Sequence, residues 1–240
     1  MSWTFVQHVH TRRSFDSLAS PARIVRRAQE VGIEVLAITD HDSWRGSIEA
    51  RAAAAAAGLK VRVVTGTEVR TDHGDVIGLF LERDVLVRDA LEFCDAVHEQ
   101  GGIVVLPHPY KWHKLSDDLL GKVDAIEVHN ARCSRHDNAR AAELAEQRNL
   151  KGLVGPDAHR VGELLLARNE FDGDPPGDEA TIKHALLNAP RRFFTEPGSI
   201  WDEWRSQAVK FLRQPDLALG WGLLRGGVRR IARPGAYGNG

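Results

Sequence analysis

Histidine and carboxylate side chains recur in this chain at short spacings. The 240 residues include 11 histidines but only two cysteines, so nitrogen and oxygen ligands for a metal ion far outnumber thiolates. His8 and His10 lie two residues apart, and in an extended strand that spacing points both imidazoles to one side. Because histidine is the commonest metal ligand, such a pair indicates a metal site.

Further ligand types follow later apolar runs of the sequence. They are His41, Glu68, His108, Asp157 and His159. A lone histidine at the end of a strand is more often a hydrogen-bonded structural residue, but that explanation would have to hold at every one of these positions. Histidines and carboxylates without a thiolate fit Zn, Mn or Fe in an open hydrolytic site better than a closed structural zinc site. A carboxylate such as Glu68 can bridge two cations, and paired metals can hold both oxygens of a phosphoryl transfer.

Seven short runs rich in β-branched residues alternate with helix-like segments. The runs cover residues 3–9, 35–39, 61–65, 76–81, 103–106, 125–128 and 153–155, and helices are predicted over 21–31, 43–57, 87–100, 134–149 and 178–188. This alternation predicts an α/β fold, and strands without polar alternation are typical of parallel strands covered on both faces. The short connection around Gly74 allows a hairpin between the third and fourth runs. Active sites of parallel sheets and barrels lie at the carboxyl ends of the strands, where these ligands would meet.

Five motifs in this order resemble the PHP (polymerase and histidinol phosphatase) superfamily, in its stand-alone metal-dependent phosphoesterase form, over roughly residues 5–165. They are His8-Val9-His10-Thr11, Ile38-Thr39-Asp40-His41-Asp42, Gly66-Thr67-Glu68, Leu106-Pro107-His108-Pro109 and Gly155-Pro156-Asp157-Ala158-His159. The resemblance implies a distorted seven-stranded β/α barrel, similar to a TIM barrel. It also implies two or three divalent metal ions (Mn, Zn, Fe or Mg) at the carboxyl ends of the strands, and hydrolysis of phosphoester bonds.

The resemblance also implies a ligand set. His8, His10, Glu68 and Asp157 would hold the first metal, Glu68 and His108 the second, and Asp16, His41 and His159 the third. Many members carry a histidine where this chain has Asp75, so we expect Asp75 to complete the second site, with His73 as the alternative. An oxygen ligand there shifts the preference toward Mn or Mg relative to Zn. His41, Asp157 and His159 are further expected to act in catalysis.

Cationic side chains beside the motifs are candidates for holding a substrate phosphate, because arginine offers two parallel hydrogen bonds and lysine a point charge. These candidates are Arg12, Lys111, Arg132 and Arg160. For any one of them, a solvated surface position is the commoner role. Asp40 has two equally plausible roles, either orienting His41 or accepting backbone amides at the strand end.

Composition narrows the class of protein. The 32 Lys and Arg against 33 Asp and Glu give a formal charge of -1, which argues against broad electrostatic binding to nucleic acid. Two cysteines are too few for a disulfide scaffold and fit a reduced cytoplasm, and no signal peptide or membrane-spanning run is visible. We therefore expect a cytoplasmic protein.

The chain is expected to consist of a barrel followed by a C-terminal extension. Residues 1–195 should form the barrel, and residues 196–240 a helical and basic extension that packs on it, with a mobile end. The arginine-rich segment 217–234 could lie on an anionic membrane, although docking on the protein itself or partial disorder is favoured because three glycines interrupt it.

The expected activity is hydrolysis of a phosphomonoester of a small metabolite by a metal-activated hydroxide. One alternative is a phosphodiesterase or nuclease acting on nucleotides or oligonucleotide ends. Another is a non-catalytic PHP module of the kind attached to replicative polymerases, against which the nearly complete ligand set argues. A third is hydrolysis of a carbon–nitrogen bond, since amidohydrolase barrels share the His-x-His opening, but the lysine or second histidine pair that they commonly need is not found.

Overall fold

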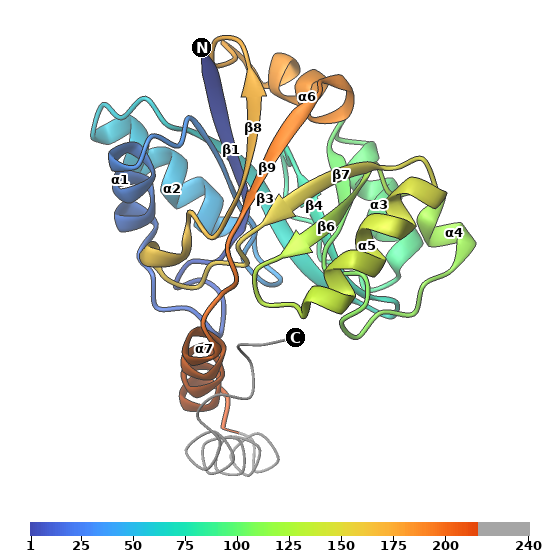
Figure 1. Cartoon of the computed structure of the whole chain (residues 1–240). Coiled ribbons are helices and arrows are strands. Elements are labelled where there is room, and N and C mark those ends of the chain that lie inside the picture. Colours follow the sequence, from blue (N-terminus) through green and yellow to red (C-terminus); the bar gives the residue numbers. More distant parts are fainter. Residues whose placement is uncertain (216–240) are drawn as a thin grey trace.

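The computed structural model describes residues 1–215, whose strands form one nine-stranded sheet in the order β7-β6-β5-β4-β3-β2-β1-β8-β9 (Figure 1). The strands are β1 (Ser2–Val9), β2 (Val35–Ile38), β3 (Arg62–Thr71), β4 (Gly74–Leu79), β5 (Ile103–Leu106), β6 (Ala125–Asn130), β7 (Lys151–Gly155), β8 (Ala167–Asp172) and β9 (Arg191–Thr195). All seven predicted strands are present, and β3 and β4 form the antiparallel hairpin that the Gly74 connection allowed. The expectation of seven strands is wrong by two.

The two additional strands, β8 and β9, have sequences that do not resemble buried strands. In β8, Ala167, Asn169 and Phe171 are buried and alternate with more exposed polar residues. β9 is mostly exposed along its length. β8 pairs with β1 in antiparallel fashion and β9 pairs with β8. Because neither strand carries a β-branched apolar run, the pattern that identified the other seven did not identify them.

The sheet curls into a nearly closed barrel. The end of β1 forms a parallel bridge from Val9 to Ala158, just after β7. Across this bridge the backbone N–H of His10 donates to the carbonyl of Ala158 at 2.8 Å, and the N–H of Ala158 donates to the carbonyl of His8 at 3.0 Å. The predicted barrel is confirmed, and its closure places two of the predicted ligand motifs side by side.

Helices cover the outside of the barrel. They are α1 (Pro21–Glu30), α2 (Arg45–Ala56), α3 (Ala90–His98), α4 (Asp117–Leu120), α5 (Arg135–Gln147), α6 (Glu179–Asn188) and α7 (Ile200–Arg213), with a short 3-10 helix, η1 (Val161–Glu163). Their starts are set by caps: Asp89, for example, accepts from the amides of Leu91 and Glu92, so α3 begins later than residue 87.

Three apolar clusters hold these layers together. One lies inside the barrel, where Phe5, Ile77 and Leu153 meet, and Ile182 and Leu186 of α6 belong to it as well. A second cluster packs the strands against α1 and α2. The third packs them against α3, α4 and α5. Because α6 lies at the end of the barrel opposite α7, the apolar filling closes one end and leaves polar chemistry to the other (Figure 1).

The expected C-terminal extension begins with a helix, α7. Its last residue, Arg213, donates to the carbonyl oxygens of Arg12 at 2.9 Å and Ser14 at 2.6 Å, which ties the helix to the loop after β1. The predictions of a basic segment over 217–234, of membrane contact there and of a mobile end concern residues outside those that the structure describes. Among residues 1–215, no helix has the length and apolar character needed to cross a bilayer.

Gly46 in the first turn of α2 provides a test of this packing. Replacing glycine by alanine in an exposed helix stabilises it by about 1 kcal/mol. Here the new methyl group would overlap the Oδ2 atom of Asp40. Thr11 holds this carboxylate in place, because its N–H donates to Oδ1 and its hydroxyl donates to Oδ2. We expect Gly46→Ala to destabilise the protein by about 1–3 kcal/mol in urea unfolding. Gly177→Ala, where the methyl group enters open space, should change stability by less than about 0.5 kcal/mol. Equal unfolding midpoints for the two variants would contradict this packing.

Candidate metal centre

A kink near the end of β1 brings the two N-terminal histidines together. His8 has a left-handed backbone with a φ of 60°, and the register of β1 against β2 shifts between Val6 and Val9. The Nε2 atoms of His8 and His10 then lie 3.3 and 3.4 Å from the Oε2 atom of Glu68. The two imidazoles therefore share one carboxylate, as their spacing indicated.

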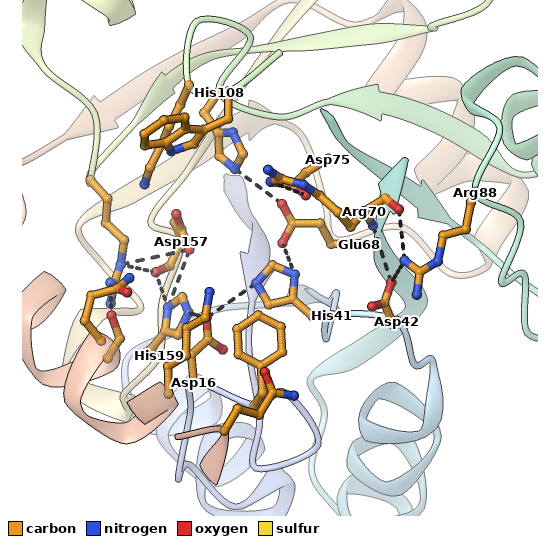
Figure 2. Close-up of a pocket in the computed structure, with 18 residues that line it drawn as sticks. Asp16, His41, Asp42, Glu68, Arg70, Asp75, Arg88, His108, Asp157 and His159 are labelled. Atoms are coloured by element: carbon orange, nitrogen blue, oxygen red, sulfur yellow. Dashed lines mark hydrogen bonds and ion pairs between the residues drawn. The ribbon is translucent and has the colours of Figure 1, made fainter. Parts of the chain in front are cut away.

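All nine predicted metal ligands fall into four overlapping groups whose ligand atoms lie within 4.8 Å of one another. The groups are His10, Asp16, His41 and His159; His8, His108 and Asp157; His8, His10 and Glu68; and Glu68, Asp75 and His108. Glu68 belongs to two groups and lies between His41 and His108 (Figure 2). This is the arrangement that a bridging carboxylate requires.

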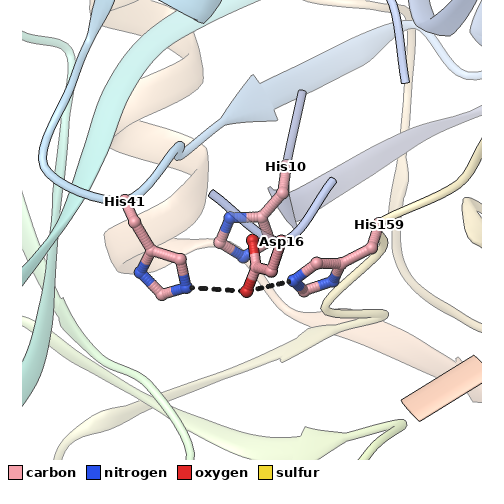
Figure 3. A group of neighbouring side chains, drawn as sticks. All are labelled: His10, Asp16, His41 and His159. Carbon is pink, nitrogen blue, oxygen red and sulfur yellow. Dashed lines mark ion pairs between the residues drawn. The ribbon is translucent and has the colours of Figure 1, made fainter. Parts of the chain in front are cut away.

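Asp16 connects the histidines of the first group. Its Oδ2 atom lies 3.0 Å from Nε2 of His159 and 3.4 Å from Nε2 of His41, and His10 lies behind it (Figure 3). Asp16 comes from the loop after β1, whereas His41 follows β2 and His159 follows β7. The group thus gathers side chains from three separate strand ends.

Asp75, and not His73, lies with Glu68 and His108. Nδ1 of His73 instead lies 3.0 Å from a carboxylate oxygen of Asp72. His113, which the sequence did not single out, contacts both Asp75 and His108. Its Nε2 atom lies 2.7 Å from the backbone oxygen of Asp75, and its ring packs edge-on against the ring of His108. His113 thereby fixes this part of the site, although its position in the sequence gives no sign of it.

Several buried polar atoms in the cluster have no hydrogen-bond partner among the described residues. They are Nε2 of His10, Oδ1 of Asp16 and Oε1 of Glu68. Leaving such atoms unpaired in the protein interior costs free energy. Divalent cations would satisfy them, and ligands of imidazole and carboxylate type suit Mn, Fe or Zn. The residues therefore fit the group of metals that the resemblance implies.

The electrostatics of the cluster also favour cations. Burial alone would raise the pKa of Asp16, Glu68 and Asp157, but the neighbouring imidazoles outweigh burial and hold all three pKa values well below the usual range. Burial likewise opposes a charge on His41, yet Glu68 and Asp16 raise its pKa to about 9. The pKa of His8 is raised for the same reason, by Glu127, Glu68 and Asp157 against burial. In the metal-free protein, the raised pKa values favour protonated His8 and His41, whose positive charge balances the carboxylates as metal ions would.

Glu127, at the end of β6, orients the ligands without belonging to any of the four groups. One of its oxygens lies 2.9 Å from Nδ1 of His8, which directs Nε2 toward Glu68. Its other oxygen accepts from the N–H of His108 at 3.0 Å and from the side-chain amide of Asn130 at 2.8 Å. A carboxylate behind a ligating imidazole is a common way to fix its tautomer.

Asp40 takes the second of its two predicted roles. It accepts from the N–H and hydroxyl of Thr11 and from the N–H of Ser14, so it organises the loop after β1. His41 is held instead by Ser14, whose hydroxyl oxygen accepts from the N–H of His41 at 2.9 Å and lies 3.1 Å from Nδ1 of His10.

A cavity of about 990 Å³ opens above the cluster, and seven of the nine predicted ligands line it. Of the four predicted phosphate-binding cations, Lys111 and Arg132 line this cavity, whereas Arg12 and Arg160 do not. Arg12 lies 3.6 Å from Glu49, and Arg160 pairs with Glu163 and Asp202. Other cations at the cavity are Arg70, Arg88 and Lys210.

Arg132 is itself buried and already engaged. Its Nε donates to the backbone oxygen of Asp157 at 2.6 Å, and its terminal nitrogens donate to Ser206 at 2.7 Å and Glu163 at 3.1 Å. The guanidinium therefore holds Asp157 and α7 in place, which is a different role from the predicted contact with a substrate phosphate.

The PHP domain family matches residues 7–172 of this chain. An uncharacterised protein of Methanocaldococcus jannaschii is 37% identical over 138 residues, which are 52% of this chain and 80% of that protein. An error-prone DNA polymerase of Mycobacterium tuberculosis is 43% identical over 237 residues, covering 89% of this chain but only 21% of the polymerase. A two-domain protein of Bacteroides vulgatus that contains a predicted PHP-like metal-dependent phosphoesterase has the same fold. Its TM-score is 0.66 at 19% identity, over 82% of this chain and 65% of that one.

The stability of the metal-free protein should fall as the pH rises from about 6.5 to 9. The folded pKa values of His8 and His41 lie above the unfolded value of about 6.5. The stabilising contribution of His41 is therefore complete below pH 6.5 and disappears as the pH passes through about 9, and the raised pKa of His8 acts in the same direction. Thermal unfolding in EDTA at pH 6.5 and pH 9 measures this slope. His41→Asn should flatten it, and the exposed His136→Asn should not. A melting temperature that is constant or rises over this range would refute the electrostatic assignment.

Removing the charge of Glu127 should weaken metal binding although Glu127 touches no metal. Glu127→Gln cannot accept from His8, His108 and Asn130 together, so the ligands lose their orientation. We expect about 10–100-fold weaker Mn²⁺ affinity by calorimetry. Glu143→Gln, an exposed substitution on α5, is the matched control. Unchanged affinity in Glu127→Gln would show that Glu127 does not support the ligands.

Proposed function

The chain belongs to the PHP domain family of metal-dependent phosphoesterases, and we propose that it hydrolyses a phosphomonoester of a small metabolite. The observation that supports this most strongly is the set of overlapping ligand groups at the floor of the 990 Å³ cavity. The cavity is large enough for a small molecule to place a phosphate against the cluster. The free thiols Cys94 and Cys133 agree with the proposed cytoplasmic location.

The nine predicted residues would hold two or three divalent ions, with Glu68 shared between sites. Ions bound there supply a nucleophile from water at neutral pH and neutralise charge on the phosphoryl group. His41, Asp157 and His159 all line the cavity, and we assign them to the reacting phosphate. The leaving alkoxide needs a proton, and one of these three side chains would donate it only where that side chain is not bound to an ion.

The cavity walls orient the substrate. Lys111 places a cation at the cavity, where a phosphate oxygen would be attracted to it. Phe15 stacks on His41 with ring centroids 4.7 Å apart, and the Nζ atom of Lys210 lies 4.8 Å from the centre of the Phe15 ring. We propose residues 1–195 as the catalytic barrel and the following segment as an extension whose helix α7 forms one wall of its cavity.

A second candidate is a phosphodiesterase or nuclease, and one residue favours it. Trp112 lines the cavity, yet 77% of its surface is exposed. An exposed indole beside a metal site can stack on a nucleobase. The long match to the error-prone DNA polymerase supports the same candidate, although this chain spans about a fifth of that protein.

Substrate profiling of the Mn²⁺-loaded protein separates the two candidates. The first predicts a kcat/KM at least about tenfold higher for sugar phosphates than for phosphodiesters and short oligonucleotides, a difference of about 1.4 kcal/mol in transition-state stabilisation. Activity on diesters or oligonucleotides alone would replace it with the second candidate. Glu68→Gln should abolish either activity.

Trp112→Ala adds a second readout to the same experiment. Loss of stacking, worth about 1–3 kcal/mol per base, should raise KM for oligonucleotides and leave KM for a sugar phosphate unchanged. Trp201→Ala removes a similarly exposed indole on α7 that does not line the cavity, and it serves as the control. An equal effect of both substitutions would exclude stacking at Trp112.

A further inference from the structure

The metal cluster is reached from a second side. A smaller cavity of about 350 Å³ lies between α1, η1 and α7. Three residues, Asp16, His159 and Ser206, line both this cavity and the larger one. Two of them, Asp16 and His159, are predicted metal ligands, so a molecule in the smaller cavity would lie next to the cluster.

Arginines dominate the charge of this smaller cavity. Arg23 of α1, Arg160 before η1 and Arg205 of α7 all line it. Asp202 lies 3.2 Å from Arg160 and 3.6 Å from Arg205, so one carboxylate is shared by two guanidinium groups. Arg160 also lies 3.1 Å from Glu163, which is already bound to Arg132. Arg23 adds a third guanidinium, so three arginines face two carboxylates, Asp16 and Asp202, among the residues that line this cavity.

The location of these arginines suits a doubly charged oxyanion. Guanidinium groups form paired hydrogen bonds with phosphate oxygens. Arg23 and Arg205 are exposed side chains that come from separate helices, and they can turn toward one ligand between them. Apolar side chains, among them Leu18, Val161 and Val209, complete the lining of the cavity.

We infer that the cavity between α1, η1 and α7 binds a phosphate group, with Arg23, Arg160 and Arg205 as its cationic partners. This inference rests on the proposed phosphoesterase activity and extends it. The phosphate is either the orthophosphate released by hydrolysis or a second phosphate on the substrate, and both present the same dianion to the arginines. The inference also keeps the phosphate-binding role that the sequence predicted for Arg160, but places that role in the smaller cavity instead of the main one.

Binding of inorganic phosphate to the EDTA-treated protein tests the site without metal or turnover. Isothermal titration should show one saturable site in the native sequence. The double variant Arg23→Ala/Arg205→Ala should lose at least about tenfold in affinity, because two of the three guanidinium groups are removed. Arg26→Ala/Arg135→Ala removes the same charge from exposed positions that line none of the described cavities, and it should bind phosphate as the native sequence does.

Two results would overturn the inference. One is the absence of saturable phosphate binding to the native sequence, and the other is equal affinity in the two double variants. Failure of the proposed function is recognised separately, because the Mn²⁺-loaded native protein would then hydrolyse no phosphoester even if the metal-free protein binds phosphate.

Steady-state kinetics distinguishes the two sources of the phosphate. If the site holds released orthophosphate, Arg23→Ala/Arg205→Ala should weaken product inhibition by phosphate at least about fivefold and leave KM for monophosphates and bisphosphates unchanged. If the site holds a second phosphate of the substrate, the same variant should raise KM for a sugar bisphosphate and not for the corresponding monophosphate. No change in either quantity would contradict the inference.

Discussion

Four buried carboxylates and five histidines lie together at one end of the barrel, and the rest of the structure is organised around the cost of burying them. The carboxylates are Asp16, Glu68, Asp75 and Asp157, none of which is more than 7% exposed. Negative charges that are buried close together repel one another strongly in a protein interior. Divalent cations would relieve this repulsion and would bind the atoms of His10, Asp16 and Glu68 that make no hydrogen bond. The elements around the cluster hold its members in place: Glu127 holds His8, Ser14 holds His41, and Arg132 holds Asp157.

Much of this centre could be predicted from the sequence because ligand type and strand position are both local features. His8, His41 and His108 each come at or just after the end of an apolar run, and parallel strands place such ends at one rim. The supporting residues could not be predicted in the same way. Glu127 reaches His8 across 119 positions of sequence, and His113 reaches Asp75 across 38, so both contacts depend on how far the sheet curls. β8 and β9 were missed because Asn169 and Arg192 occupy positions where a buried strand would carry an apolar residue.

Helix α7 lines both cavities beside the cluster. It is anchored through Arg213 to the loop after β1 and through Ser206 to Arg132, and Ser206 lines both cavities. The family match ends at residue 172, before this helix begins. The barrel therefore carries the proposed ligands, while α7, which contributes Ser206 and Lys210 to the lining of the cavity, lies outside the match. Such a division is common where one fold supports several substrates.

We propose that this cluster would hold a set of divalent cations, with Glu68 shared between their sites. Anomalous scattering from crystals grown with Mn²⁺ tests it most directly, because it counts the ions and places them without an assay. Two or three anomalous peaks are expected, one beside Asp16, His41 and His159 and the others beside Glu68. A single peak, or none in crystals soaked to saturation, would contradict it.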